Sequence, residues 1–180
     1  ESTYTTYDRQ IAAHAQVWLR EEATRHHDKP WVLFVSFVSP HFPLTAPPEH
    51  YYAYADLDLP MPKRHGRPDR DSHPYVRDYA STLDYGAYFE DDAHVKRALA
   101  SYYGLCTFLD EQIGKVLGAL RDAGLASATR IVYTSDHGDN LGARGLWGKS
   151  TMYEESAGCP LIVAGEGIPQ GAVREEPVSH

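Results

Sequence analysis

The amino-acid sequence predicts an α/β fold in which helices cover a mostly parallel central sheet. Residues 31–38 and 131–134 are short apolar runs rich in β-branched and aromatic side chains, as strands buried inside a sheet are. Residues 93–122 carry apolar side chains three and four positions apart, which is the spacing of a helix that buries one face. Polar segments follow both predicted strands, and ligands bind at the carboxyl ends of strands in open α/β sheets.

The composition indicates a globular protein with a packed core. The chain has 180 residues, 42% of them hydrophobic, which is enough for one domain. Its formal net charge of −8 argues against nucleic acid or an anionic membrane surface as a partner. No apolar run reaches the roughly 18 residues that a membrane span needs. We expect Cys106 and Cys159 to be reduced core residues, which favours the cytoplasm over the periplasm. A homo-oligomeric state is a further possibility.

The chain begins with a predicted helix over residues 7–27. Apolar residues follow helical spacing there, with Asp8 near the expected start and basic residues near the end. Lys29-Pro30 ends the helix, because proline disfavours a helical conformation in the residue before it. Residues 31–38 follow as a central strand that is apolar on both faces.

A proline-rich loop, residues 39–48, places His41 at the carboxyl end of that strand. One interpretation is a rigid turn that carries an exposed histidine. The other is a histidine that the prolines fix at the edge of a crevice, which we favour because a second polar motif follows the later strand.

Residues 49–93 are tyrosine-rich and are the least informative part of the chain. We expect a long insertion near the mouth of the active site. Its aromatic side chains would either bind an organic group or cation, or simply pack the insertion onto the domain. Asp69, Asp71, His73 and Asp78 could be mistaken for a metal cluster, but a solvated polar loop is the better interpretation.

The later strand, residues 131–134, is followed by Asp136 and His137. Neighbouring side chains on a strand point to opposite faces, so the chain must turn for both to reach one ion, and Gly138 permits such a turn. An aspartate with an imidazole suits Mn²⁺ or Zn²⁺ readily and Ca²⁺ less obviously. The alternative is an ordinary turn with a solvated histidine.

A glycine-rich loop makes that alternative weaker. Gly142, Gly145 and Gly148 precede Lys149, and glycines let the main chain fold close to a bound group and return a compact cation to it. After the loop, residues 152–155 predict a short helix. Its Glu154 and Glu155 could support the metal ligands from behind, but we expect them on an exposed face. Residues 159–165 predict another strand.

Residues 134–149, from Thr134-Ser-Asp-His-Gly to Trp-Gly-Lys149, resemble the signature of the sulfatase family in the alkaline phosphatase-like superfamily. The branch of choline sulfatases and phosphonate monoester hydrolases is the most similar. The resemblance implies a three-layer α/β/α fold, with Asp136 and His137 as metal ligands and Lys149 in contact with the sulfate or phosphonate group. His41 in Pro-His41-Phe-Pro resembles a family histidine that contacts the transferred group or protonates the leaving oxygen.

The resemblance also implies cofactors. The resemblance implies one divalent ion, and Ca²⁺ is the ion that the family most often uses. Mn²⁺ is the alternative, because His137 stands where many arylsulfatases carry asparagine. The family's nucleophile is a formylglycine made from Cys or Ser in Cys/Ser-x-Pro-x-Arg, and neither Cys106 nor Cys159 fits that motif. It is expected upstream, so the chain resembles only the C-terminal half of the catalytic domain. We expect residues 1–180 alone to bind metal weakly and to be inactive.

Residues 1–180 are therefore interpreted as part of a sulfatase catalytic domain. Residues 1–48 contain a helix, a strand and the His41 loop, and residues 49–93 form the insertion. Residues 94–180 contain a helix, the strand before the metal pair, the Lys149 loop and a further strand. The implied reaction is hydrolysis of a small-molecule sulfate ester. The alternatives are a phosphonate or phosphate ester hydrolase (a phosphodiesterase) of the same superfamily, and a non-catalytic homologue that binds ligands.

Overall fold

The computed structural model describes residues 2–25, 28–66 and 73–179. The helices are α1 (Thr3–Glu21), α2 (Pro48–Ala55), α3 (Pro74–Thr82), α4 (Asp92–Asp122) and α5 (Glu154–Ala157), and the strands are β1 (Ile131–Thr134) and β2 (Leu161–Ala164). Single 3₁₀ turns lie at Ala23–Arg25, Tyr85–Tyr88, Ala126–Ala128 and Ala143–Gly145. Within the described residues, no helix is both long and apolar enough to cross a membrane.

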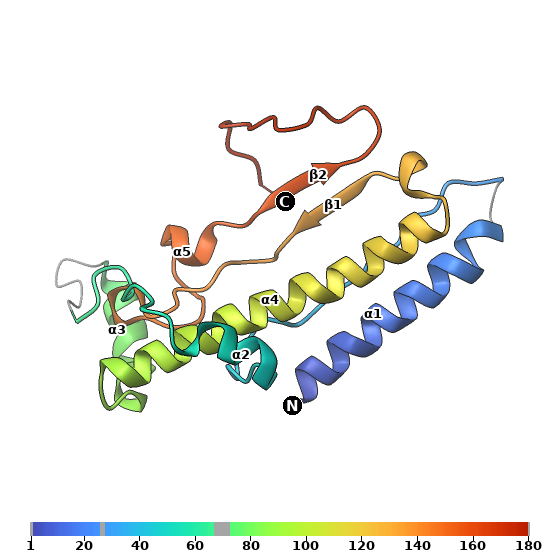
Figure 1. Cartoon of the computed structure of the whole chain (residues 1–180). Helices are drawn as coiled ribbons and strands as arrows, with labels where there is room; N and C mark the ends of the chain where they lie inside the picture. Colours follow the sequence, from blue (N-terminus) through green and yellow to red (C-terminus); the bar gives the residue numbers. More distant parts are fainter. Residues whose placement is uncertain (1, 26–27, 67–72, 180) are drawn as a thin grey trace.

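Helix α4 is the element against which the others pack, with α1 along one side and the two strands on the other (Figure 1). It begins where the side chain of Asp91 accepts a hydrogen bond from the main-chain N–H of His94, at 2.7 Å. It ends before Gly124, whose φ of +73° suits the left-handed turn that follows a helix. The helix predicted for residues 93–122 is confirmed to within one residue.

Helix α1 begins four residues before the predicted start. Ser2 and Thr5 form a capping box, in which each side chain accepts a hydrogen bond from the other's main-chain N–H at 3.1 Å. Asp8 consequently lies in the second turn and is fully buried, so its expected place at the helix start is wrong. The helix stops at Glu21, before the predicted end, and residues 26–27 lie outside the described part of the chain.

Two apolar clusters flank α4. One joins the C-terminal parts of α1 and α4 through Leu19, Ala23, Ala119 and Leu120, with Ile131 of β1 against it. The other joins the start of α4 to the glycine-rich loop through Val95, Leu99 and Trp147. The second cluster anchors the loop that carries Lys149.

The sheet differs from the prediction. β1 and β2 are present as expected, but they pair antiparallel, with Ile131 opposite Ala164 and Thr134 opposite Leu161. Residues 31–38 form no strand in this chain, so the predicted strand and the parallel sheet are not confirmed here. The segment shows the alternate exposure of an extended chain, with Val32 94% exposed and Phe34 88% exposed. It has no strand partner among the described residues, and a strand requires a neighbour to bond with.

Residues 49–93 contain more regular structure than the sequence indicated. α2 packs on α4, and α3 begins at His73, whose Nδ1 accepts a hydrogen bond from the N–H of Tyr75 at 3.2 Å. His73 is therefore a helix cap, while Asp69 and Asp71 lie outside the described residues.

Both cysteines are free, and burial raises the pKa of Cys106 to about 11, so this thiol stays protonated at neutral pH.

Candidate active site

The predicted metal pair lies directly after β1, which runs toward the end of the molecule where α2, α3 and α5 gather (Figure 1). The chain turns there as expected, and Oδ2 of Asp136 lies 3.5 Å from Nε2 of His137. The role of Gly138 is different from the predicted one. It does not adopt a positive φ; instead, a Cβ at this position would collide with the main-chain oxygen of Glu155. Glycine is required because α5 approaches the turn so closely.

His137 presents the nitrogen that a ligand needs. Its Nδ1 lies 2.7 Å from the main-chain oxygen of Gly138, and because a carbonyl only accepts, Nδ1 carries the hydrogen. The lone pair of Nε2 then points to Nζ of Lys149, 2.9 Å away.

His41 repeats this arrangement from the other side. Its Nδ1 lies 2.7 Å from the oxygen of Phe42, and its Nε2 lies 3.4 Å from Nζ of Lys149. The ammonium group of Lys149 is therefore held between two imidazole nitrogens, and it forms no ion pair with a carboxylate of the described residues. The structure brings the four predicted residues together, although they come from segments more than 90 residues apart.

The His41 loop is held in place by a residue that the sequence did not reveal. Both carboxylate oxygens of Asp8 accept main-chain hydrogen bonds, from Val38 at 2.8 Å and from Ser39 at 2.9 Å. Because Asp8 is fully buried in α1, it fixes the start of the loop against the helix. A polar residue inside an amphipathic helix was the only signal for this contact.

The base of the glycine-rich loop is closed by Asp139 and Asn140. Oδ1 of Asp139 accepts hydrogen bonds from the N–H groups of Leu141 and Gly148, at 2.8 and 3.1 Å. Asn140, which is 1% exposed, bonds Gly148 and Thr151 on either side of Lys149. The sequence did not distinguish these two residues, because polar side chains are common in loops.

The tip of the loop is tied to α5 by an ion pair. Nη1 of Arg144 lies 3.0 Å from Oε2 of Glu155, and its guanidinium covers the ring of Tyr153 at 4.1 Å. Nζ of Lys63 reaches the other carboxylate oxygen at 3.2 Å. Burial raises the pKa of Glu155, but hydrogen bonds from its own main chain, Arg144 and Lys63 outweigh burial and lower the pKa overall. Glu155 is thus a paired residue and not the exposed one expected.

An open cavity of about 290 Å³ lies over this cluster. Its lining consists of Asp136, His137, Lys149, Ser150, Thr151, Met152, Ser156 and Ala157. The side chain of Asp136 is 84% exposed, so its carboxylate is available to an additional ligand. The arrangement offers the ammonium of Lys149 to a small anionic group, and the carboxylate of Asp136 to a cation.

The residues partly fit a divalent metal ion. Asp136 and His137 both line the cavity, and a carboxylate with an imidazole is the donor chemistry of a Mn²⁺ or Zn²⁺ site, although Nε2 of His137 is bonded to Lys149 in this structure. The described residues contain no group of three or more His, Cys, Asp or Glu side chains placed to bind one ion. Among the described residues, Asp136 and His137 would therefore be two ligands at most, fewer than a closed metal site has.

Comparison with known proteins gives the family. A family model described as "Sulfatase" matches residues 1–180, and the choline-sulfatase of Rhizobium meliloti (strain 1021) is 33% identical over 168 residues. The chain belongs to the sulfatase family. The match to the choline-sulfatase covers 92% of this chain and 33% of the relative. An arylsulfatase of Clostridium perfringens is 34% identical, covering 77% of this chain and 28% of the relative.

Solved structures agree with this membership of the sulfatase family. The phosphonate monoester hydrolase SpPMH from Silicibacter pomeroyi superposes with a TM-score of 0.74 at 31% identity, over 89% of this chain and 33% of that one. The predicted branch of choline sulfatases and phosphonate monoester hydrolases is confirmed by these two relatives, and the fold is of mixed α/β class. The chain spans about a third of the length of both relatives.

Proposed function

We propose that the full-length protein containing this chain hydrolyses sulfate esters at the site around Lys149. The observation that carries the proposal is the position of the Lys149 ammonium, 2.9 Å from His137 and 3.4 Å from His41, with no carboxylate of the described residues paired to it. A lysine that only stabilised the fold would be expected to pair with an acid. A cation left facing an open cavity is suited to an oxyanion.

Each residue then has a role set by its geometry. Lys149 binds an oxygen of the sulfuryl group and stabilises negative charge on it in the transition state. His41 presents Nε2 toward the same place, where it can hold a proton for the leaving-group oxygen. Asp136 and His137 would hold part of a divalent ion, Ca²⁺ by family or Mn²⁺, which supplies Lewis-acid stabilisation when bound.

The nucleophile and the remaining metal ligands are proposed to come from another part of the full-length protein. Family membership implies a formylglycine, and this chain carries no residue in the corresponding motif. We also propose that residues 31–38 and β1 join a larger, mostly parallel sheet in the full-length protein. The apolar side chains of Val32 and Phe34, both almost fully exposed here, are typical of a strand covered by other elements.

A second candidate is hydrolysis of phosphonate or phosphate esters. It is favoured by the structural similarity to a phosphonate monoester hydrolase and by the imidazole of His137 in the metal pair. Lys149 and His41 would keep the same roles, because both reactions transfer a tetrahedral group with anionic oxygens. A homologue that binds such esters without cleaving them is the remaining alternative.

The test is hydrolysis of an aryl sulfate and an aryl phosphonate monoester by the full-length protein. The metal is first removed with a chelator, and Ca²⁺ and Mn²⁺ are then added back separately. We expect faster turnover of the sulfate and recovery with at least one ion. A preference for the phosphonate would select the second candidate, and binding of both esters without turnover would select the non-catalytic alternative.

Residues 1–180 expressed alone provide the matched control. With two metal ligands and no nucleophile, we expect no measurable turnover of either ester. A clear sulfatase rate from this piece would show that the chain contains a complete site and that the proposed division of the catalytic groups is wrong.

A further inference from the structure

We propose that Asn140 is a positioning residue that holds Lys149 in the active site. The proposal rests on the function proposed above. Asn140 is 1% exposed and bonds to residues on both sides of Lys149. Its main-chain N–H and its side-chain Nδ2 both donate to the oxygen of Gly148, at 2.7 and 2.8 Å, while its Oδ1 accepts from the hydroxyl of Thr151 at 3.2 Å.

The chemistry of these contacts requires an amide. A carbonyl oxygen only accepts hydrogen bonds, so the atom that faces Gly148 must be the nitrogen of the Asn140 side chain. Its oxygen is then left for Thr151. An aspartate of the same shape would place an acceptor against the Gly148 carbonyl, and alanine would leave both Gly148 and Thr151 without their side-chain contacts.

Lys149 needs this support because its ammonium group is held only by two imidazole nitrogens, and the longer of the two contacts is 3.4 Å. Its Nζ pairs with no carboxylate of the described residues, so the position of the main chain at Lys149 helps to decide where the ammonium lies. Ser150, the next residue, has a φ of +76°. Such a conformation costs a non-glycine residue on the order of 1 kcal/mol and persists only where the surroundings hold it. Asn140 bridges the residues that flank this strained step.

The first measurement compares Asn140→Ala with Gln112→Ala in the full-length protein. Gln112 is a matched control, because it is also a buried amide that is 1% exposed, but it lies within α4 and bonds to Phe108 and Lys115. We expect Asn140→Ala to lower kcat by roughly 10- to 100-fold with KM changed less than threefold, since small misplacements of a catalytic group have effects of this size. Gln112→Ala should leave kcat within about twofold, as loss of packing alone would.

The decisive measurement repeats Asn140→Ala in a Lys149→Ala background. If Asn140 acts through Lys149, adding the second substitution lowers kcat by less than about twofold, because the group that it positions is gone. Multiplication of the two losses would overturn the proposal, as would an unchanged kcat in Asn140→Ala. Should Asn140→Ala fail to fold, Thr151→Val tests the same bridge from its other end and should show the same dependence on Lys149.

A readout that needs no turnover separates this proposal from the proposed function. Amide hydrogen exchange should rise in residues 139–151 of Asn140→Ala and stay unchanged there in Gln112→Ala. If wild-type protein cleaves neither ester, the proposed function fails, and the exchange result still decides whether Asn140 orders the segment around Lys149. Unchanged exchange in Asn140→Ala would refute the positioning role whatever the activity.

Discussion

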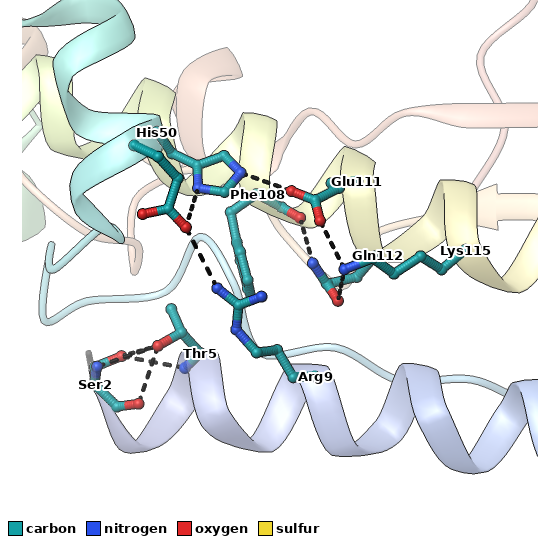
Figure 2. A network of polar contacts seen from close by, with 9 residues as sticks. Ser2, Thr5, Arg9, His50, Phe108, Glu111, Gln112 and Lys115 are labelled. Carbon is teal, nitrogen blue, oxygen red and sulfur yellow. Dashed lines mark hydrogen bonds and ion pairs between the residues drawn. The ribbon is translucent and has the colours of Figure 1, made fainter.

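Two clusters that contain histidine and lysine side chains, one around Lys149 and one around His50, are built in opposite ways. Around Lys149 the cation faces two imidazole nitrogens and an open cavity. Around His50, Figure 2 shows the cations and carboxylates of α1, α2 and α4 joined into one network. The charged side chains are paired with opposite charges in the network around His50, whereas Lys149 has no such pairing with the described residues.

The network around His50 satisfies its own charges. Nε2 of His50 lies 2.9 Å from Glu111, which also binds Lys115 at 2.6 Å. Nδ1 of His50 lies 3.6 Å from Glu49, an ion-pair distance that is too long for a hydrogen bond, and Arg9 reaches Glu49 at the same distance. Arg9 also lies over the buried ring of Phe108, 5.0 Å from its centre.

The two kinds of cluster differ in whether their charged side chains are paired with opposite charges, and not in the types of residue that they contain. Both clusters contain a histidine in contact with a charged side chain, which is Lys149 at the site and Glu111 in the network. In the network, each cation has an acid within 4 Å, so little charge is left to attract a ligand. At the site, the acid is 84% exposed and the lysine is paired with nitrogen atoms, so both remain able to bind an incoming group.

Lys149→Ala should give the largest effect and acts on activity alone. Removal of one charge-stabilising group from an active site costs roughly 10²- to 10³-fold in kcat. We expect a loss of this size for the better ester substrate of the full-length protein, with the free energy of unfolding changed by less than about 0.5 kcal/mol, because Lys149 has no ion pair with the described residues to lose. Steady-state kinetics and denaturant unfolding measure the two quantities.

The control for this prediction is Lys115→Ala, which removes a lysine from the network instead. Its kcat should stay within about twofold of wild type. Equal losses of activity in the two variants would mean that the comparison between the clusters has no functional content.

His50→Ala should act in the opposite sense, on stability. The side chain is 8% exposed, bonds Glu111 and packs edge-on against Phe108 with ring centres 5.6 Å apart. Its loss removes a buried contact between α2 and α4 and should lower the free energy of unfolding by about 2 kcal/mol. Thermal melting of the full-length protein measures the change, with His14→Ala, on the exposed face of α1, as the matched histidine control. Loss of kcat without loss of stability in His50→Ala would place this histidine in the active site.

The sequence could predict those parts of the molecule that depend on local patterns. α4 follows from its apolar spacing, and β1 from four residues of strand type. The four candidate residues were found because each stands at a strand end or a loop end. The pairing of residues 31–38 could not be judged from the sequence, because a strand depends on a partner elsewhere in the chain.

The residues that hold the site in place could not be found in this way. Asp8 lies 30 residues from the N–H group of Val38 that it binds, and Asn140 acts through contacts on both sides of Lys149. No local periodicity distinguishes a buried aspartate in a helix from a solvated one. Such positioning contacts appear only when the chain is folded, because they are defined by where main-chain donors lack other partners.

Glu111→Gln should give the smallest effect and tests the network through pH. A hydrogen bond from Lys115 lowers the pKa of Glu111 most; burial opposes this, and His50 adds a further lowering, so the pKa lies below its usual value overall. A carboxyl group with a lowered pKa in the folded state stabilises the fold above its unfolded pKa, and this contribution is lost as the pH falls through the folded value. Because the side chain is 45% exposed, solvent screening limits the contribution to under about 1 kcal/mol. Wild type should therefore be slightly more stable than Glu111→Gln at pH 7, and melting curves should show the difference shrinking as the pH falls below the unfolded pKa of glutamate, about 4.3. A difference that persists unchanged into acid would show that the carboxylate charge is not what holds His50 and Lys115 in the network.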